Sequence, residues 1–102
     1  MRRNLEIEVK GAEFYNSNPK YIELMKIDPW FTPEKIRAYE LSRKLKDPYG
    51  RTDTTQVAII LNQEFYPEEL SVERRWSNVK VSRLVSSYER KIKVLKNERN
   101  NR

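Results

Sequence analysis

The strongest pattern in the chain is a helical repeat of apolar residues close to its C-terminal end. At about 100° per residue, these side chains fall within roughly 40° of one line along a helix. The apolar positions are Val81, Leu84, Val85, Tyr88, Ile92 and Leu95. The segment contains neither glycine nor proline. The pattern predicts a long amphipathic helix that starts at Ser77 or Asn78, ends near Asn97 and turns one face to the core.

A second helix is predicted from the residues that start it. Thr32-Pro33-Glu34 combines a capping hydroxyl, a proline at the first helical position and an acid near the positive end of the helix dipole. We expect this helix to run to about Lys46, where the turn residues Asp47-Pro48-Tyr49-Gly50 follow. One face of it would cover the core with Ala38, Leu41 and Leu45, and the other sides would carry Arg37, Arg43 and Lys44.

The segment between residues 53 and 65 is apolar on nearly every side. The run Val57-Ala58-Ile59-Ile60-Leu61 is compatible with a buried strand, but a cap at Asp53 or Thr54 and the polar residues that follow favour a central helix. Pro67 would end this helix. The next segment, Glu68 to Trp76, is compatible with a helical turn, and its continuity with the C-terminal helix stays open.

Signals are weaker at the two ends of the chain. Residues 1–18 alternate briefly at Leu5, Ile7 and Val9, which predicts a flexible arm or a short edge strand. A short helix is expected from Pro19 to Lys26, and Trp30 and Phe31 should then enter the core. We therefore predict an all-α protein with one helical domain over residues 19–97 and a disordered tail over residues 98–102.

The net charge of +6 is concentrated at one end of the sequence. Residues 71–102 contain 10 Lys and Arg against 3 Asp and Glu, whereas residues 1–70 contain 11 against 12. Such a basic segment attracts a polyanion through Coulomb forces and counterion release, and it offers little to a neutral small molecule. The alternative is that the charge only keeps a solvated helix soluble.

The helical period places the basic residues of the C-terminal helix on its polar faces. A major groove about 12 Å wide admits one α-helix, and Arg, Lys, Asn and Ser reach phosphates and base edges from it. Arg74 and Arg75 would contribute if the preceding segment lies at the DNA. The predicted DNA-binding residues in the helix are Asn78, Lys80, Ser82, Arg83, Ser87, Arg90 and Lys91.

The region from about residue 53 to residue 97 resembles the helix-turn-helix DNA-binding proteins of bacterial and phage regulator type. Its first helix carries a small residue, Ala58, where the family packs one against the second helix. The run Ser77-Asn78-Val79-Lys80-Val81-Ser82-Arg83-Leu84-Val85 is similar to recognition helices of that family. The resemblance implies that Asn78, Lys80, Ser82 and Arg83 face DNA.

The chain departs from that family between its two helices. The tight turn of the family spans only about 3 to 4 residues and usually contains glycine. Here the residues from Tyr66 to Trp76 intervene, and none of them is glycine. Either a helical segment is inserted or that segment itself lies at the DNA.

The composition removes most catalytic chemistry. Without histidine or cysteine, the usual general base, the usual metal ligands and the Ser-His and Cys-His nucleophiles are absent. With only two glycines, no dinucleotide fingerprint or phosphate-cradling loop can form. What survives is a magnesium site from Glu64, Glu68 and Glu69, which more often cap and solvate a helix junction, or a ribonuclease that uses Tyr, Arg and Glu.

These patterns predict a cytoplasmic protein that binds duplex DNA, as a transcriptional regulator or a replication or packaging accessory of a prokaryote or its virus. We expect no catalytic residue, cofactor, metal, small-molecule substrate, signal peptide or membrane span, and homodimerisation stays open. An adaptor whose basic helix docks on an acidic protein is the alternative, and a small ribonuclease is the third. Stacking of unpaired bases on Tyr49, Tyr66, Trp76 or Tyr88 ranks below duplex binding.

Overall fold

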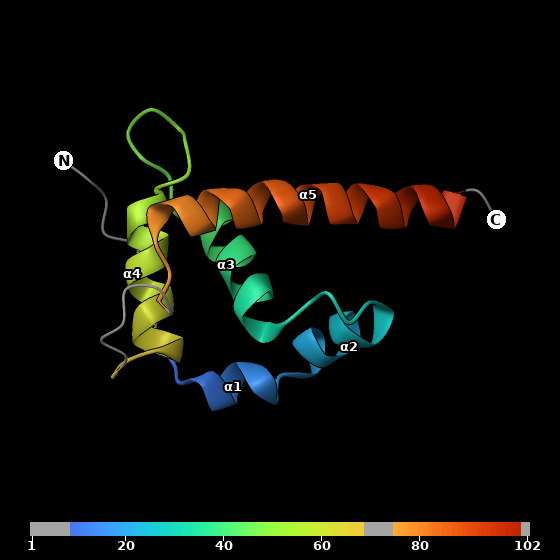
Figure 1. Ribbon diagram of the computed structural model, residues 1–102, viewed down its shortest axis with the longest axis horizontal. Coiled ribbons are helices and arrows are strands. Elements are labelled where there is room, and N and C mark those ends of the chain that lie inside the picture. Colours follow the sequence, from blue (N-terminus) through green and yellow to red (C-terminus); the bar gives the residue numbers. More distant parts are fainter. Residues whose placement is uncertain (1–8, 69–74, 101–102) are drawn as a thin grey trace.

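Residues 9–68 and 75–100 of the 102-residue chain are described by a computed structural model. This part of the chain forms helices and contains no strand, so the predicted all-α class is confirmed (Figure 1). The helices are α1 (Ala12–Asn16), α2 (Pro19–Ile27), α3 (Pro33–Lys44), α4 (Thr54–Phe65) and α5 (Asn78–Asn100). The segment expected to form a turn between α4 and α5 lies largely outside the described residues.

Helices α3, α4 and α5 each begin at a polar side chain that binds one of the first free backbone N–H groups. Thr32 accepts from the N–H of Lys35 at 3.3 Å at the start of α3, and Asp53 accepts from the N–H of Gln56 at 3.1 Å at the start of α4. Ser77 accepts from the N–H of Lys80 at 3.3 Å at the start of α5. These caps satisfy donors that have no partner within the helix, and they confirm the predicted starts.

The N-terminal prediction was wrong over part of its range. Within the expected arm or edge strand, Ala12–Asn16 forms α1, and its Tyr15 is only 3% exposed. Residues 1–8 of that range lie outside the described residues. At the other end, α5 continues to Asn100, so residues 98–100 are helical rather than part of a disordered tail.

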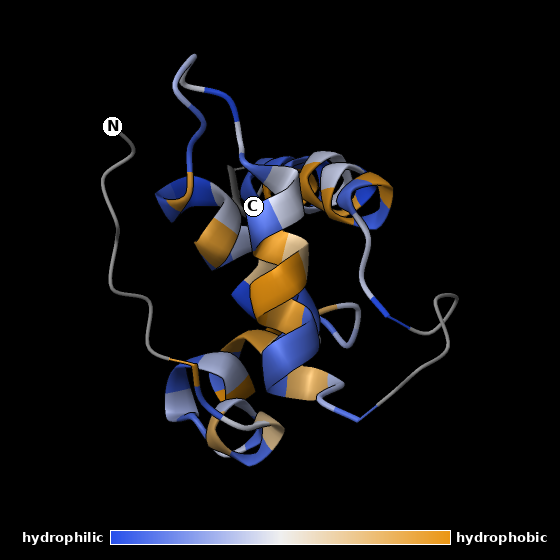
Figure 2. Ribbon diagram, turned by 90° about the vertical axis from the view of Figure 1, so that its left-hand side faces the viewer, coloured by the Kyte–Doolittle hydropathy of each residue, from blue (hydrophilic) through white to orange (hydrophobic). Residues whose placement is uncertain are grey.

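The core lies where α3, α4 and α5 pack against one another. Figure 2 looks onto the side of the molecule where α4 lies and shows a run of apolar residues along this helix. Its Val57, Ile60 and Leu61 are buried, whereas Ile59 is 46% exposed. The apolar residues of α4 are stable because α3 and α5 pack against this helix and cover them.

The connection between α3 and α4 is a compact turn that projects from the body (Figure 1). An isolated antiparallel bridge joins Lys46 to Thr52 across it. The Asp47 side chain accepts from the N–H groups of Tyr49 at 2.8 Å and Arg51 at 2.9 Å. Gly50 has φ of 83°, a left-handed conformation that glycine adopts without steric cost. The predicted turn is confirmed.

The N-terminal half of α5 packs on the body, and its C-terminal half extends away from α3 and α4 (Figure 1). Tyr88 anchors it, because its ring stacks on that of Tyr39 with 4.1 Å between centroids and an interplanar angle of 10°. Trp30 and Phe31 contact the same ring edge to face. Among the described residues, no helix has both the length and the apolar run needed to cross a membrane.

Candidate nucleic-acid interface

The predicted DNA-binding residues of α5 differ in their exposure. Asn78, Lys80, Ser82, Arg83 and Arg90 are exposed. The remaining predicted residues are half-buried or undescribed: Ser87, Lys91 and Arg75 are half-buried, and Arg74 lies outside the described residues.

Lys91 is held away from the solvent by an ion pair. Its Nζ lies 2.5 Å from Oδ2 of Asp28, which precedes α3. Hydrogen bonds from Lys91 and from the backbone N–H of Trp30 lower the pKa of the Asp28 carboxyl. Lys91 therefore fixes α5 to the body, and the prediction that it faces DNA has no support from this geometry.

Arg83, Arg90 and Lys93 mark one continuous exposed surface on α5. Within the described part of the chain, these three side chains form no ion pair. We call this surface the outer face. It consists of Val79, Ser82, Arg83, Ser86, Arg90, Lys93, Val94 and Asn97, all exposed and none acidic.

A groove of about 430 Å³ lies beside the first turns of α5. At about 100° per residue, Lys80, Arg83 and Ser87 fall within about 60° of one another and form one wall of it. We call it the tryptophan groove. Its lining consists of Trp30, Glu34, Lys35, Tyr66, Arg75, Trp76, Lys80, Arg83, Leu84 and Ser87.

Trp76 is held in the groove by its backbone. The Asn62 side chain accepts from the N–H of Trp76 at 2.7 Å and donates to its carbonyl oxygen at 3.0 Å. An amide side chain is suited to this pairing because it carries both a donor and an acceptor. The chain is thus joined to α4 immediately before α5 begins.

Glu34 links two aromatic residues of the groove. Its Oε1 accepts from the Tyr66 hydroxyl at 2.5 Å and from the Trp76 indole N–H at 3.1 Å. Burial and this hydrogen bond raise the pKa of Tyr66 to about 12. The carboxylate therefore fixes the positions of the Tyr66 and Trp76 rings, and its Oε1 accepts from both of them.

Among the described residues that line the groove, the cations Lys35, Arg75, Lys80 and Arg83 outnumber the acid Glu34. Lys35 donates to the carbonyl oxygen of Trp30 at 3.1 Å, and its Nζ lies 4.2 Å from the centre of the Trp30 ring. Lys80 donates to the carbonyl oxygen of Arg75 at 2.9 Å. The Nε of Arg75 is buried and has no hydrogen-bond partner. A positive surface thus surrounds aromatic walls.

The sequence prediction missed part of this groove. Glu34 was assigned only to a helix start, and Lys35 was not considered. Trp30 was placed in the core, although it is half-buried and lines the groove. The available signal was the pairing of aromatic and basic residues within both short segments, 30–35 and 75–83. Nothing in the sequence alone indicated that the two segments meet.

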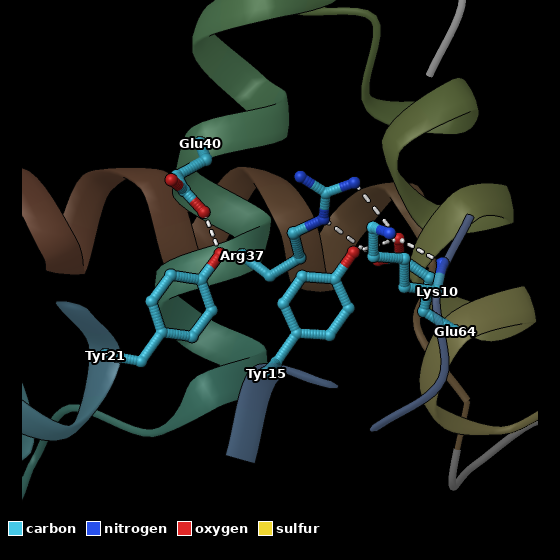
Figure 3. A network of polar contacts seen from close by, with 6 residues as sticks. All are labelled: Lys10, Tyr15, Tyr21, Arg37, Glu40 and Glu64. Carbon is cyan, nitrogen blue, oxygen red and sulfur yellow. Dashed lines mark hydrogen bonds and ion pairs between the residues drawn. The ribbon is translucent and has the colours of Figure 1, made fainter. Parts of the chain in front are cut away.

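Glu64 belongs to a buried network and not to a solvated helix junction (Figure 3). Arg37 donates to it twice, from Nε to Oε1 and from Nη2 to Oε2, both at 3.0 Å. The Tyr15 hydroxyl donates to Oε2 at 2.5 Å. Glu64 is 2% exposed and Arg37 is 9% exposed, so the expectation that Arg37 lies off the core face was wrong.

The network brings together a tyrosine, an arginine and a glutamate, the residue types named for a ribonuclease. Burial closes this group to a substrate, and its hydrogen bonds already occupy the Glu64 oxygens. The proposed magnesium ligand Glu69 lies outside the described residues. Within the described ranges, no three carboxylates or other ligand side chains group closely enough to hold a metal.

Tyrosine ionisation should destabilise this fold at alkaline pH. Burial, helped by hydrogen bonds to Glu64 and Glu40, raises the pKa of Tyr15 and of Tyr21 above the usual value. Burial also raises the pKa of Tyr88 to about 12. Because the unfolded chain loses these protons first, the stability is full below about pH 10 and falls as the pH rises toward about 12.

Urea unfolding followed by circular dichroism at a series of alkaline pH values tests this expectation. The midpoint should fall over that pH range together with the appearance of tyrosinate absorbance. The Tyr88→Phe variant should show a shallower fall, because it removes one linked proton. Equal pH dependence in the variant and the parent protein would assign the effect to other groups.

Comparison with protein-family models, with curated proteins and with solved structures finds no match to this chain.

Proposed function

We propose that the protein binds duplex DNA through the outer face of α5. The observation that carries this proposal is the exposed row of Arg83, Arg90 and Lys93, which form no ion pair with a described residue, although the exposed Glu89 lies beside Arg90 and Lys93. Cations that lack an internal partner are available to replace the counterions of phosphate groups. Serine and asparagine side chains between them supply hydrogen bonds to phosphates and base edges.

The dimensions of α5 support the same proposal. A helix of 23 residues is about 34 Å long, and its diameter with side chains is about 10 to 12 Å. This width fits a major groove about 12 Å wide. The extension of α5 away from the body leaves its outer face accessible along much of the helix (Figure 1).

The resemblance to helix-turn-helix proteins would make α5 the recognition helix. Under that proposal, Asn78, Lys80, Ser82 and Arg83 meet the DNA first, and a role in transcription, replication or packaging follows. Many proteins of this class bind two half-sites as dimers, so a second copy is part of the proposal. The binding role and the regulatory role are separate claims, and only the first follows from charge.

Fluorescence anisotropy of a labelled duplex over a series of salt concentrations tests the binding role. We expect log K to fall with log salt with a slope of about −3 or steeper, as several phosphate contacts require. The double variant Arg83→Ala, Arg90→Ala should bind at least about tenfold more weakly and should reduce the slope by about 2.

Lys26→Ala is the matched control, because Lys26 is exposed on α2 and is not part of the outer face of α5. It should retain the parent affinity to within about twofold. Absence of duplex binding at about 50 mM salt would contradict the proposal, since low salt favours binding by basic proteins. Parent-like binding by the double variant would contradict it equally, and an acidic protein partner would then be the leading alternative.

A further inference from the structure

The tryptophan groove differs from the outer face in its chemistry. It is lined by the aromatic residues Trp30, Tyr66 and Trp76 together with Arg75 and Arg83. Its volume of about 430 Å³ falls within the range of about 300 to 1,000 Å³ typical of sites for small ligands. A duplex is too broad to enter a space of this size, so a ligand of the groove must be a smaller chemical group.

Arg75 provides the first indication of what that group is. Its Nε is buried and has no hydrogen-bond partner, although the Lys80 side chain bonds to its backbone carbonyl. A buried donor without a partner costs free energy, and the cost is greater when the group is charged. An anion in the groove would accept from the Arg75 guanidinium, and Arg83, which also lines the groove, would contribute a second positive charge.

The aromatic walls provide the second indication. Trp30 and Trp76 are half-buried, and hydrogen bonds position the Trp76 backbone and indole. Fixed aromatic rings next to cations are the arrangement that stacks unpaired bases and neutralises their phosphates. Glu34 is the acid among the described residues of the lining, and its Oε1 already accepts from Tyr66 and Trp76.

We propose that the tryptophan groove binds one unpaired nucleotide. The base lies against Trp30 and Trp76, and the phosphate is bound by Arg75 and Arg83. This inference deepens the proposed function and rests on it where the nucleotide belongs to the bound DNA. A base displaced from the duplex or a frayed end would then enter the groove while α5 holds the paired region.

The chain offers a direct probe, because its only two tryptophans both line the groove. Adenosine monophosphate, adenosine and inorganic phosphate are titrated separately into the labelled full-length protein, and the two indole N–H signals are followed by NMR. Both signals should shift with adenosine monophosphate, which should bind at least about tenfold more tightly than adenosine or phosphate alone. Unmoved indole signals at millimolar nucleotide would overturn the proposal.

Two variants test the groove itself. Arg75→Gln should weaken adenosine monophosphate at least about tenfold, because the charge that meets the phosphate is removed. Ser87→Leu places a larger side chain in the groove and should block the base without changing any charge. Arg90→Gln, on the outer face, is the control and should leave nucleotide affinity unchanged. Parent-like nucleotide binding by both folded groove variants would overturn the proposal.

The source of the nucleotide is resolved by a short single-stranded oligonucleotide. Tighter binding of the oligonucleotide than of the mononucleotide supports a strand as the source, and equal affinity supports a free nucleotide. The duplex assay separates this inference from the proposed function. Weaker duplex binding in Arg90→Gln alone, together with weaker nucleotide binding in Arg75→Gln alone, supports both proposals. If one assay fails, the result of the other still stands.

Discussion

Replacing Glu64 with glutamine should lower the free energy of unfolding by about 3 to 5 kcal/mol. The amide keeps the shape of the side chain but removes the negative charge that two Arg37 donors meet at 3.0 Å. Both residues are buried, so water cannot replace the lost partner of the guanidinium. Burial by itself lowers the pKa of Arg37, and the hydrogen bonds from Arg37 to Glu64 raise it above the usual value.

Guanidinium unfolding followed by far-ultraviolet circular dichroism measures this loss. Glu23→Gln is the control, because Glu23 is exposed on α2, and it should change the stability by no more than about 0.5 kcal/mol. The double variant Arg37→Met, Glu64→Leu should recover most of the stability, because it removes both buried charges together. Equal stability of Glu64→Gln and Glu23→Gln would show that the pair contributes little.

The helix starts were predictable because capping depends on residues close together in the sequence. Thr32, Asp53 and Ser77 each bind a backbone N–H within the next three residues, so the signal is contained in a short segment. The helix ends were less certain. Helix α3 ends at Lys44, before the expected Lys46, because Lys46 pairs with Thr52 in the bridge that closes the following turn.

The buried ion pair could have been anticipated from helical spacing. Val57, Leu61 and Glu64 are separated by four and three residues, so Glu64 falls on the apolar face of its helix. A carboxylate on such a face predicts a buried partner. Only the packing of α3 on α4 identifies Arg37 as that partner, because 27 residues separate Arg37 from Glu64 in the sequence.

The tryptophan groove was beyond reach of the sequence for a related reason. Its walls come from the start of α3, the end of α4 and the start of α5. Tyr66 and Trp76 meet at Glu34, which lies more than thirty residues from either of them. Helical periodicity describes one helix at a time, and it gives no measure of which helix ends lie together.

The outer face differs in this respect, because it belongs to a single helix. The period of α5 alone placed Arg83 and Arg90 on its polar side, and both are exposed. It also placed Lys91 there, at the edge of that side. The ion pair with Asp28 shows that the neighbouring segment decides whether a residue at this edge faces the solvent or the body of the protein.

Truncating Tyr88 to alanine should lower the free energy of unfolding by about 3 to 5 kcal/mol. Tyr88 is 5% exposed and contacts three aromatic rings, those of Tyr39, Trp30 and Phe31. The substitution removes these contacts and leaves a cavity between α3 and α5. Denaturant unfolding of the variant measures the loss.

Two controls show whether the loss arises from the ring cluster. Tyr88→Phe keeps the ring and should change the stability by less than about 1.5 kcal/mol, as a volume-conserving change does. Val94→Ala, at a position 49% exposed on the same helix, should change it by about 0.5 kcal/mol or less. A Tyr88→Ala variant as stable as Val94→Ala would mean that other contacts hold α5.

The same variant separates stability from binding. Because Tyr88 points into the core and the outer face lies on the opposite side of α5, folded Tyr88→Ala should retain duplex affinity to within about twofold. The double variant Arg83→Ala, Arg90→Ala should show the reverse, with parent stability and weak binding. If both variants lost binding and stability together, α5 would bind only as part of a rigid body, and the outer face alone would not account for recognition.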